Sequence, residues 1–132
     1  MKNRLKRLVV AISAFSIIVG GTLSVQAREI GEFSSFKVTY KGAEKFTGYL
    51  YKAVTNGNGV VNLSNDTGTA WITANMKNSD GVFRGGVNLQ RCTRKEFSST
   101  GTAGYKYRLG LKKTNNTGGG SVVIKGSWSP DA

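Results

Sequence analysis

The sequence contains no histidine, one cysteine, one proline and only seven acidic residues in 132. Without histidine, no imidazole can act as a general base or as a metal ligand. The single cysteine, Cys92, cannot form a disulfide within the chain. The seven acids stand against 19 lysines and arginines, so the formal net charge is +12. These absences exclude histidine-based catalysis and a disulfide scaffold, and the charge favours a partner of opposite sign.

The one long apolar run lies at the amino terminus, in a segment with the three parts of a secretory signal peptide. Basic residues at positions 2–7 precede an apolar stretch at 8–19, and Val25-Gln26-Ala27 places small residues at the cleavage positions. The apolar stretch is shorter than the roughly 20 residues of a membrane-spanning helix, which favours cleavage over an uncleaved anchor. We therefore expect residues 1–27 to be removed and the product to be secreted, free or associated with the cell surface.

Residues 28–132 are long enough for one small domain and carry a net charge of +8, from 15 basic and seven acidic residues. They are rich in glycine, and short alternating runs are separated by turn signals such as Asn56-Gly57. No run predicts a long helix, and residues 91–98 predict one helical turn at most. The pattern predicts an all-β, single-domain antiparallel β-sandwich of about seven strands, with a barrel as the alternative. The strands are expected at 36–40, 49–54, 60–63, 70–74, 82–92, 105–112 and 121–128.

Alternation within these strands also predicts the core. In the clearest strand, at 105–112, aromatic and aliphatic residues alternate with basic residues and glycine, as in a half-buried antiparallel strand. The expected core residues are Phe36, Val38, Tyr40, Tyr49, Tyr51, Val61, Leu63, Trp71, Val87, Leu89, Tyr105, Tyr107, Leu109, Leu111, Val122, Ile124 and Trp128.

Basic residues are concentrated between positions 84 and 113, where Glu96 is the only acid. Period-two alternation places Lys106, Arg108 and Lys112 together on the outer face of their strand. Such a stripe suits an anionic cell-wall polymer or membrane surface, whereas nucleic acid is disfavoured for a secreted protein. An equally weighted alternative is a solvated face that keeps the protein soluble. The candidate polyanion-binding residues are Lys106, Arg108 and Lys112, with Arg91, Arg94 and Lys95 as neighbours.

The sequence contains no signature of catalysis, of a metal site or of a cofactor. No spacing brings two of the seven carboxylates together as a glycosidase pair. No run matches a calcium loop, and Gly118-Gly119-Gly120 lacks the residues of a phosphate loop. For Cys92 a buried strand thiol is favoured over a reactive nucleophile, and an intermolecular disulfide remains open. We therefore expect a non-enzymatic protein.

The carboxyl-terminal third carries a short motif that resembles a known group. The strand at 105–111, a polar turn and Val122-Val123-Ile124-Lys125 lead into Gly126-Ser127-Trp128-Ser129-Pro130-Asp131. This arrangement resembles small secreted proteins of Gram-positive bacteria, in a family of unknown function that ends in Gly-x-Trp-x-Pro-Asp. The resemblance implies an extracellular β-sandwich and assigns no activity or site. From the residues themselves, Trp128 is expected to close one end of the sandwich and Pro130 to end the last strand.

Two hypotheses of function follow. The first is a secreted, non-catalytic binding module that acts at an anionic cell-envelope surface or on a protein partner. The second is a secreted cationic antimicrobial or toxin-like protein, although no membrane-active amphipathic segment follows the signal. An enzyme ranks third.

Overall fold

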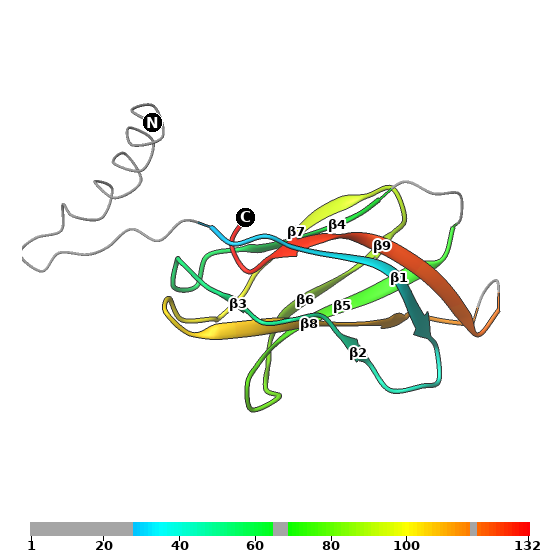
Figure 1. The fold of residues 1–132 in the computed structure, drawn as a ribbon, viewed down its shortest axis with the longest axis horizontal. Coiled ribbons are helices and arrows are strands. Elements are labelled where there is room, and N and C mark those ends of the chain that lie inside the picture. The colour runs from blue at the N-terminus through cyan, green and yellow to red at the C-terminus, as the bar shows by residue number, and fades with distance from the viewer. Residues whose placement is uncertain (1–27, 65–68, 117–118) are drawn as a thin grey trace, which may run out of the picture.

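The computed structural model describes residues 28–64, 69–116 and 119–132, so the expected signal peptide lies outside the described residues. The described chain forms two antiparallel sheets that pack face to face (Figure 1). The smaller sheet has the strand order β1-β9-β4-β7, and the larger has the order β2-β8-β5-β6, with β3 also paired to β8. The strands are β1 (Gly31–Thr39), β2 (Lys45–Phe46), β3 (Leu50–Tyr51), β4 (Gly59–Leu63), β5 (Trp71–Asn78), β6 (Phe83–Gln90), β7 (Arg94–Phe97), β8 (Lys106–Lys113) and β9 (Ser121–Ser129).

The all-β sandwich expected from the sequence is confirmed, with nine strands in place of about seven. The helical turn allowed at 91–98 is wrong, because Arg94–Phe97 forms β7 and pairs with β4. Its first three residues are charged and exposed, so this edge strand shows no apolar alternation. Strand β2 is only two residues long and gives no period at all.

The core lies between the inner faces of the two sheets. Val38, Val61 and Ile124 of the smaller sheet meet Leu109 and Leu111 of the larger sheet in one buried cluster. Large side chains at these positions are almost fully removed from water, which is the main stabilising contribution of such a fold.

The prediction of the core is wrong for five residues, because their side chains are between 38% and 65% exposed. In β5 the alternation runs in the opposite phase, so that Ile72 and Met76 face the core and the bulky Trp71 faces outward. The exposed residues are Tyr40, Tyr49, Tyr51, Trp71 and Tyr105. The buried apolar residues that the pattern missed are Phe33, Val60, Ile72, Ala74, Met76 and Phe97.

A β-bulge in β1 explains why two aromatic residues three positions apart both reach the core. The register with β9 shifts between Phe33 and Phe36, and Ser35 has a positive φ of 49°. An extra residue in one strand restores the inward direction that strict alternation would lose. Both phenylalanines are therefore buried, with ring centroids 5.3 Å apart.

The carboxyl-terminal residues fasten the smaller sheet to the segment that follows β3 of the larger sheet. Strand β9 ends at Ser129, just before the proline, and Trp128 is 2% exposed, as the motif predicted. Beyond them Asp131 accepts hydrogen bonds from the backbone N–H groups of Ala53 and Val54. Its carboxylate also lies 3.2 Å from the ammonium of the fully buried Lys52. This buried ion pair was not predicted.

Candidate polyanion-binding face

The outer face of β8 carries the three cations that the alternation placed there. Lys106 is exposed and Arg108 and Lys112 are half-buried, whereas Tyr107 and Leu109, which alternate with the cations, point into the core. A strand rises about 3.3 Å per residue, so Lys106 and Lys112 are separated by about 20 Å along the sheet. The three cations therefore form a line on one face and not a single cluster.

Two aromatic rings pack against two of these cations, Lys106 and Arg108. The Arg108 guanidinium carbon lies 3.9 Å from the ring centroid of Phe46 and 5.2 Å from that of Tyr49. The Lys106 ammonium lies 4.9 Å from the Tyr49 centroid. The buried Nε of Arg108 has no hydrogen-bond partner among the described residues, which fits a guanidinium held by stacking. The aromatic rings orient the charges without neutralising them.

A fourth cation, Lys77, lies on the same face and is bound to a carboxylate. It occupies β5 directly opposite Arg108, and its ammonium is 2.6 Å from Oε1 of Glu44. The side-chain amide of Asn75 donates to the other Glu44 oxygen at 2.7 Å. Burial alone would raise the pKa of Glu44. The hydrogen bonds from Lys77 and Asn75, together with the charges of Lys77 and Lys112, outweigh that effect and hold the pKa below its ordinary value.

Gly110 of β8 makes room for this arrangement. A Cβ at this position would lie 2.8 Å from the Glu44 carboxyl carbon and 2.8 Å from the Phe46 ring. Any side chain would therefore displace the two groups that hold Lys77 and Arg108. With four cations and one carboxylate, this face has a net charge of +3. We call the outer surface formed by Lys77, Lys106, Arg108, Lys112, Glu44 and the rings of Phe46 and Tyr49 the basic face.

The other three candidate residues do not lie on the basic face. Strand β7 belongs to the smaller sheet, where Arg94 and Glu96 form an exposed ion pair at 3.4 Å. Arg91 lies in the preceding turn and donates to the carbonyl of Val123 in β9. The Lys95 ammonium lies 6.0 Å from the ring centroid of Trp71 in β5 of the larger sheet. The structure thus separates the two groups of cations that the sequence placed in one stretch.

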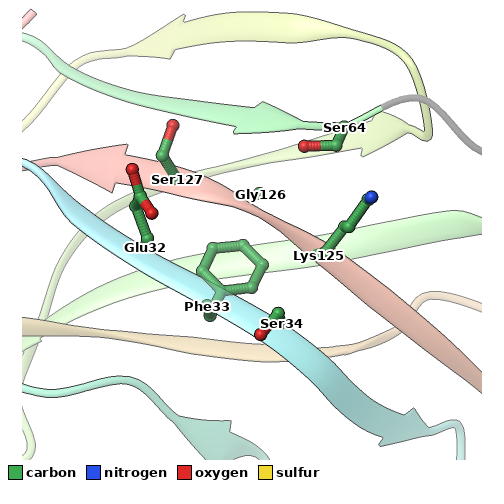
Figure 2. A pocket seen from close by; sticks show the side chains of 7 residues that line it. All are labelled: Glu32, Phe33, Ser34, Ser64, Lys125, Gly126 and Ser127. Atoms are coloured by element: carbon green, nitrogen blue, oxygen red, sulfur yellow. The ribbon is translucent and has the colours of Figure 1, made fainter.

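A shallow hollow of about 450 Å³ lies on the smaller sheet, beside the bulge of β1 (Figure 2). Glu32 and Lys125 stand on opposite sides of the Phe33 ring, with serine hydroxyls around them. None of these polar side chains bonds to another described residue. Among the described residues that line the hollow, one carboxylate and one ammonium give no net charge that would attract an anion.

The expectation of a buried strand thiol at Cys92 is wrong. Cys92 is exposed in the turn between β6 and β7, and its φ is 67°. This left-handed conformation turns the chain from the larger sheet to the smaller one. Within residues 28–64, 69–116 and 119–132, no three cysteine or acidic side chains gather in a way that could hold a metal ion.

Comparison with known proteins gives no relative: no family model, no curated protein and no solved structure matches the chain. The resemblance of the Gly-x-Trp-x-Pro-Asp motif therefore stays a prediction. In the part of the chain that the structure describes, no helix is long and apolar enough to cross a membrane.

Proposed function

We propose that the protein is a secreted, non-catalytic module that binds an anionic polymer of a cell envelope through the basic face of its larger sheet. The observation that supports this most directly is the packing of Arg108 and Lys106 on Phe46 and Tyr49. A face that only kept the protein soluble would need no such arrangement, because freely moving lysines serve that purpose equally well.

Aromatic packing affects binding through the entropy of the side chains. A free lysine or arginine loses up to about 2 kcal/mol of rotamer entropy when a ligand fixes it. On the basic face part of this loss has already occurred on folding, so more of the electrostatic attraction remains for the ligand. Each cation near an anionic surface contributes on the order of 1 kcal/mol, so several of them must act together.

The shape of the basic face favours a polymer over a small anion. The cations are spread over about 20 Å of strand β8, and in the described residues Glu44 is the single carboxylate of this face. A chain with a negative charge on each repeating unit, such as a teichoic acid, can meet several of these cations at once. Such binding releases counterions and should weaken steeply with salt.

Cosedimentation of the purified protein with isolated cell walls of a Gram-positive bacterium tests this function. Walls that retain their phosphate polymers should bind the protein at low salt and release it as sodium chloride is raised to 0.5 M. Walls treated with hydrofluoric acid to remove those polymers should bind at least tenfold less. Equal binding to both wall preparations, or binding that does not respond to salt, would contradict the proposal.

A further inference from the structure

A second concave site lies at one end of the larger sheet, next to the basic face. The turn between β5 and β6 and the loop before β8 enclose a pocket of about 560 Å³, which we call the end pocket. Its volume falls within the range of about 300–1,000 Å³ that is usual for small-molecule sites. The side chains with binding chemistry are those of Tyr51, Asp80, Arg84, Tyr105 and Lys106.

Hydrogen bonds hold both walls of the end pocket in place. On one side the Asn78 side chain accepts from the backbone N–H groups of Asp80 and Val82, which closes the β5–β6 turn. On the other side the hydroxyl of buried Tyr107 accepts from the backbone N–H of Thr102 at 2.7 Å. A pocket with walls fixed in this way loses little entropy when it is filled.

The end pocket combines exposed aromatic rings with a cation that pairs with no side chain in the described part of the chain. Tyr51 is 49% exposed and Tyr105 is 65% exposed, although large aromatic side chains usually bury most of their area. The half-buried Arg84 makes no side-chain hydrogen bond or ion pair with any described residue. A guanidinium that is partly removed from water and left unpaired is suited to an anionic group of a ligand.

We propose that the end pocket binds one sugar unit that carries a phosphate or a carboxylate group, at or near the end of the polymer bound by the basic face. The apolar C–H face of a sugar ring packs on an aromatic ring such as Tyr105. The Arg84 guanidinium pairs with the anionic group, and the Asp80 carboxylate accepts hydrogen bonds from sugar hydroxyls. The choice of ligand class rests on the function proposed above.

Two observations connect the end pocket with the basic face. Lys106 lines the pocket and also packs on Tyr49 of the basic face. Tyr51 is the cross-strand partner of Lys106, so both side chains leave the sheet on the same side. A polymer that follows β8 therefore reaches the end pocket without a change of direction.

Titration of the ¹⁵N-labelled protein, followed by NMR, tests this inference with four probes: N-acetylglucosamine 6-phosphate, glucuronic acid, N-acetylglucosamine and inorganic phosphate. Saturable shifts are expected at residues 78–84 and 102–106 with one or both anionic sugars. The neutral sugar and inorganic phosphate should each bind at least fivefold more weakly. Whichever anionic sugar binds more tightly identifies the charged group of the natural ligand.

Single substitutions separate the contribution of the Arg84 charge from that of the Tyr105 ring. Arg84→Gln should reduce binding of the anionic sugar to the level of the neutral one, and Tyr105→Ala should weaken all sugars at least fivefold. The matched controls Arg28→Gln and Tyr40→Ala, on exposed residues outside the pocket, should change nothing. Absence of saturable shifts, shifts located elsewhere, or inorganic phosphate binding as tightly as the anionic sugars would overturn the inference.

The double variant Arg108→Gln/Lys112→Gln distinguishes this inference from the proposed function. It should lose binding to cell walls but keep the binding of the anionic sugar in the end pocket. If the unmodified protein fails to bind walls while the sugar still saturates the pocket, the proposed function is wrong and the pocket is not. If walls bind and no sugar does, only the pocket assignment is overturned.

Discussion

The outer faces of the two sheets differ in the arrangement of their charges more than in their composition. The larger sheet presents four cations and one carboxylate, and aromatic rings or Glu44 hold three of the four cations. On the smaller sheet, Lys37, Lys125 and Arg94 lie among the carboxylates of Glu32 and Glu96, and the side chains are mostly exposed. Cations are therefore common on both faces, but on the larger sheet they outnumber the carboxylates four to one and most are held by a neighbouring side chain.

This difference shows that charge density along the sequence is a poor guide to how charges are arranged on the folded surface. The stretch 84–113 carries eight of the 15 basic residues of positions 28–132, yet these eight are divided between two sheets and the turn that joins β6 to β7. Strand β8 differs from the others because the short strands β2 and β3 pair with it. Glu44, Phe46 and Tyr49 lie in these two strands or next to them.

The largest effect is expected where the carboxyl terminus joins the two sheets. Asp131→Ala removes the only carboxylate within the described residues that pairs with buried Lys52, and it removes the acceptor of two backbone N–H groups. Loss of one partner of a buried ion pair costs about 3–5 kcal/mol, and we expect the free energy of unfolding to fall by that amount. Urea denaturation followed by tryptophan fluorescence measures it.

Two further variants control this experiment. Glu32→Ala, on an exposed carboxylate that bonds to no other described side chain, should change stability by less than about 0.5 kcal/mol. The double variant Lys52→Met/Asp131→Asn removes both charges and should be more stable than Asp131→Ala. If Asp131→Ala is as stable as the unmodified protein, the ion pair does not join the two sheets.

The second prediction compares how stability depends on pH for two ion pairs, Glu44 with Lys77 on the larger sheet and Glu96 with Arg94 on the smaller sheet. The pKa of Glu44 is below its ordinary value in the folded state. The contribution of ionised Glu44 to the free energy of unfolding is therefore fully present above the ordinary carboxyl pKa of about 4.3. It is lost as the pH falls through the lowered pKa of the folded state. At pH 7 we expect Glu44→Gln to cost about 1.5–3 kcal/mol, as is typical of hydrogen bonds to a charged group.

Glu96→Gln on the smaller sheet is the matched control. The exposed pair of Glu96 and Arg94 should contribute less than about 1 kcal/mol at any pH. Denaturant unfolding of both variants between pH 7 and pH 3 distinguishes them. If Glu44→Gln and Glu96→Gln lose the same small amount, the charges of the larger sheet are no more ordered than those of the smaller one.

The third prediction concerns the ring beneath Arg108. Phe46→Leu keeps an apolar side chain but removes the aromatic face, so the guanidinium loses a contact of about 0.5–1 kcal/mol. We expect a similar fall in stability and a loss of about threefold in affinity for cell walls. Phe83→Leu is the control, since Phe83 is exposed in β6 and no cation lies over its ring in the described structure. Equal effects of both variants would show that stacking does not organise the basic face.

The smallest effect is expected at the turn between the two sheets. Cys92 is exposed, so Cys92→Ser should change the free energy of unfolding by less than about 0.5 kcal/mol. A buried thiol would lose considerably more on this substitution. Thermal unfolding of the two proteins under reducing conditions measures the difference, and a loss above about 1.5 kcal/mol would contradict the exposed position.

The sequence predicted the features that depend on local alternation. In β8 Lys106, Arg108 and Lys112 occupy the face opposite to the core residues, because a strand of eight residues has a clear period of two. Lys113 at the end of the strand departs from this division, because it lies on the inner face and is buried. In β5 the same reasoning failed, since a run such as Ala70-Trp71-Ile72-Thr73-Ala74 can be placed in either phase. The large side chain of Trp71 favours the phase in which Trp71 is buried. In the structure β5 is paired on both sides, with β6 and β8, and Ile72 faces the core.

The sequence could not predict features that depend on distant residues. Glu44 and Phe46 meet the basic face through strand β2, which has only two residues and no pattern. Lys52 and Asp131 are 79 residues apart, and no local pattern in the sequence links them. The alternation and the usual burial of aromatic residues predict that Tyr49 and Tyr105 lie in the core, whereas both are exposed in the structure.

Two variants of equal charge distinguish binding through the basic face from binding driven by net charge alone. One replaces Lys106, Arg108 and Lys112 with glutamine, and the other replaces the exposed Lys37, Lys41 and Lys125 on or beside the smaller sheet, so each loses three positive charges. After circular dichroism has shown that both are folded, their affinity for untreated cell walls is measured at low salt. At about 1 kcal/mol for each cation, the first should lose about 100-fold in affinity and the second less than threefold. Equal losses would show that net charge alone drives binding and that the basic face has no special role.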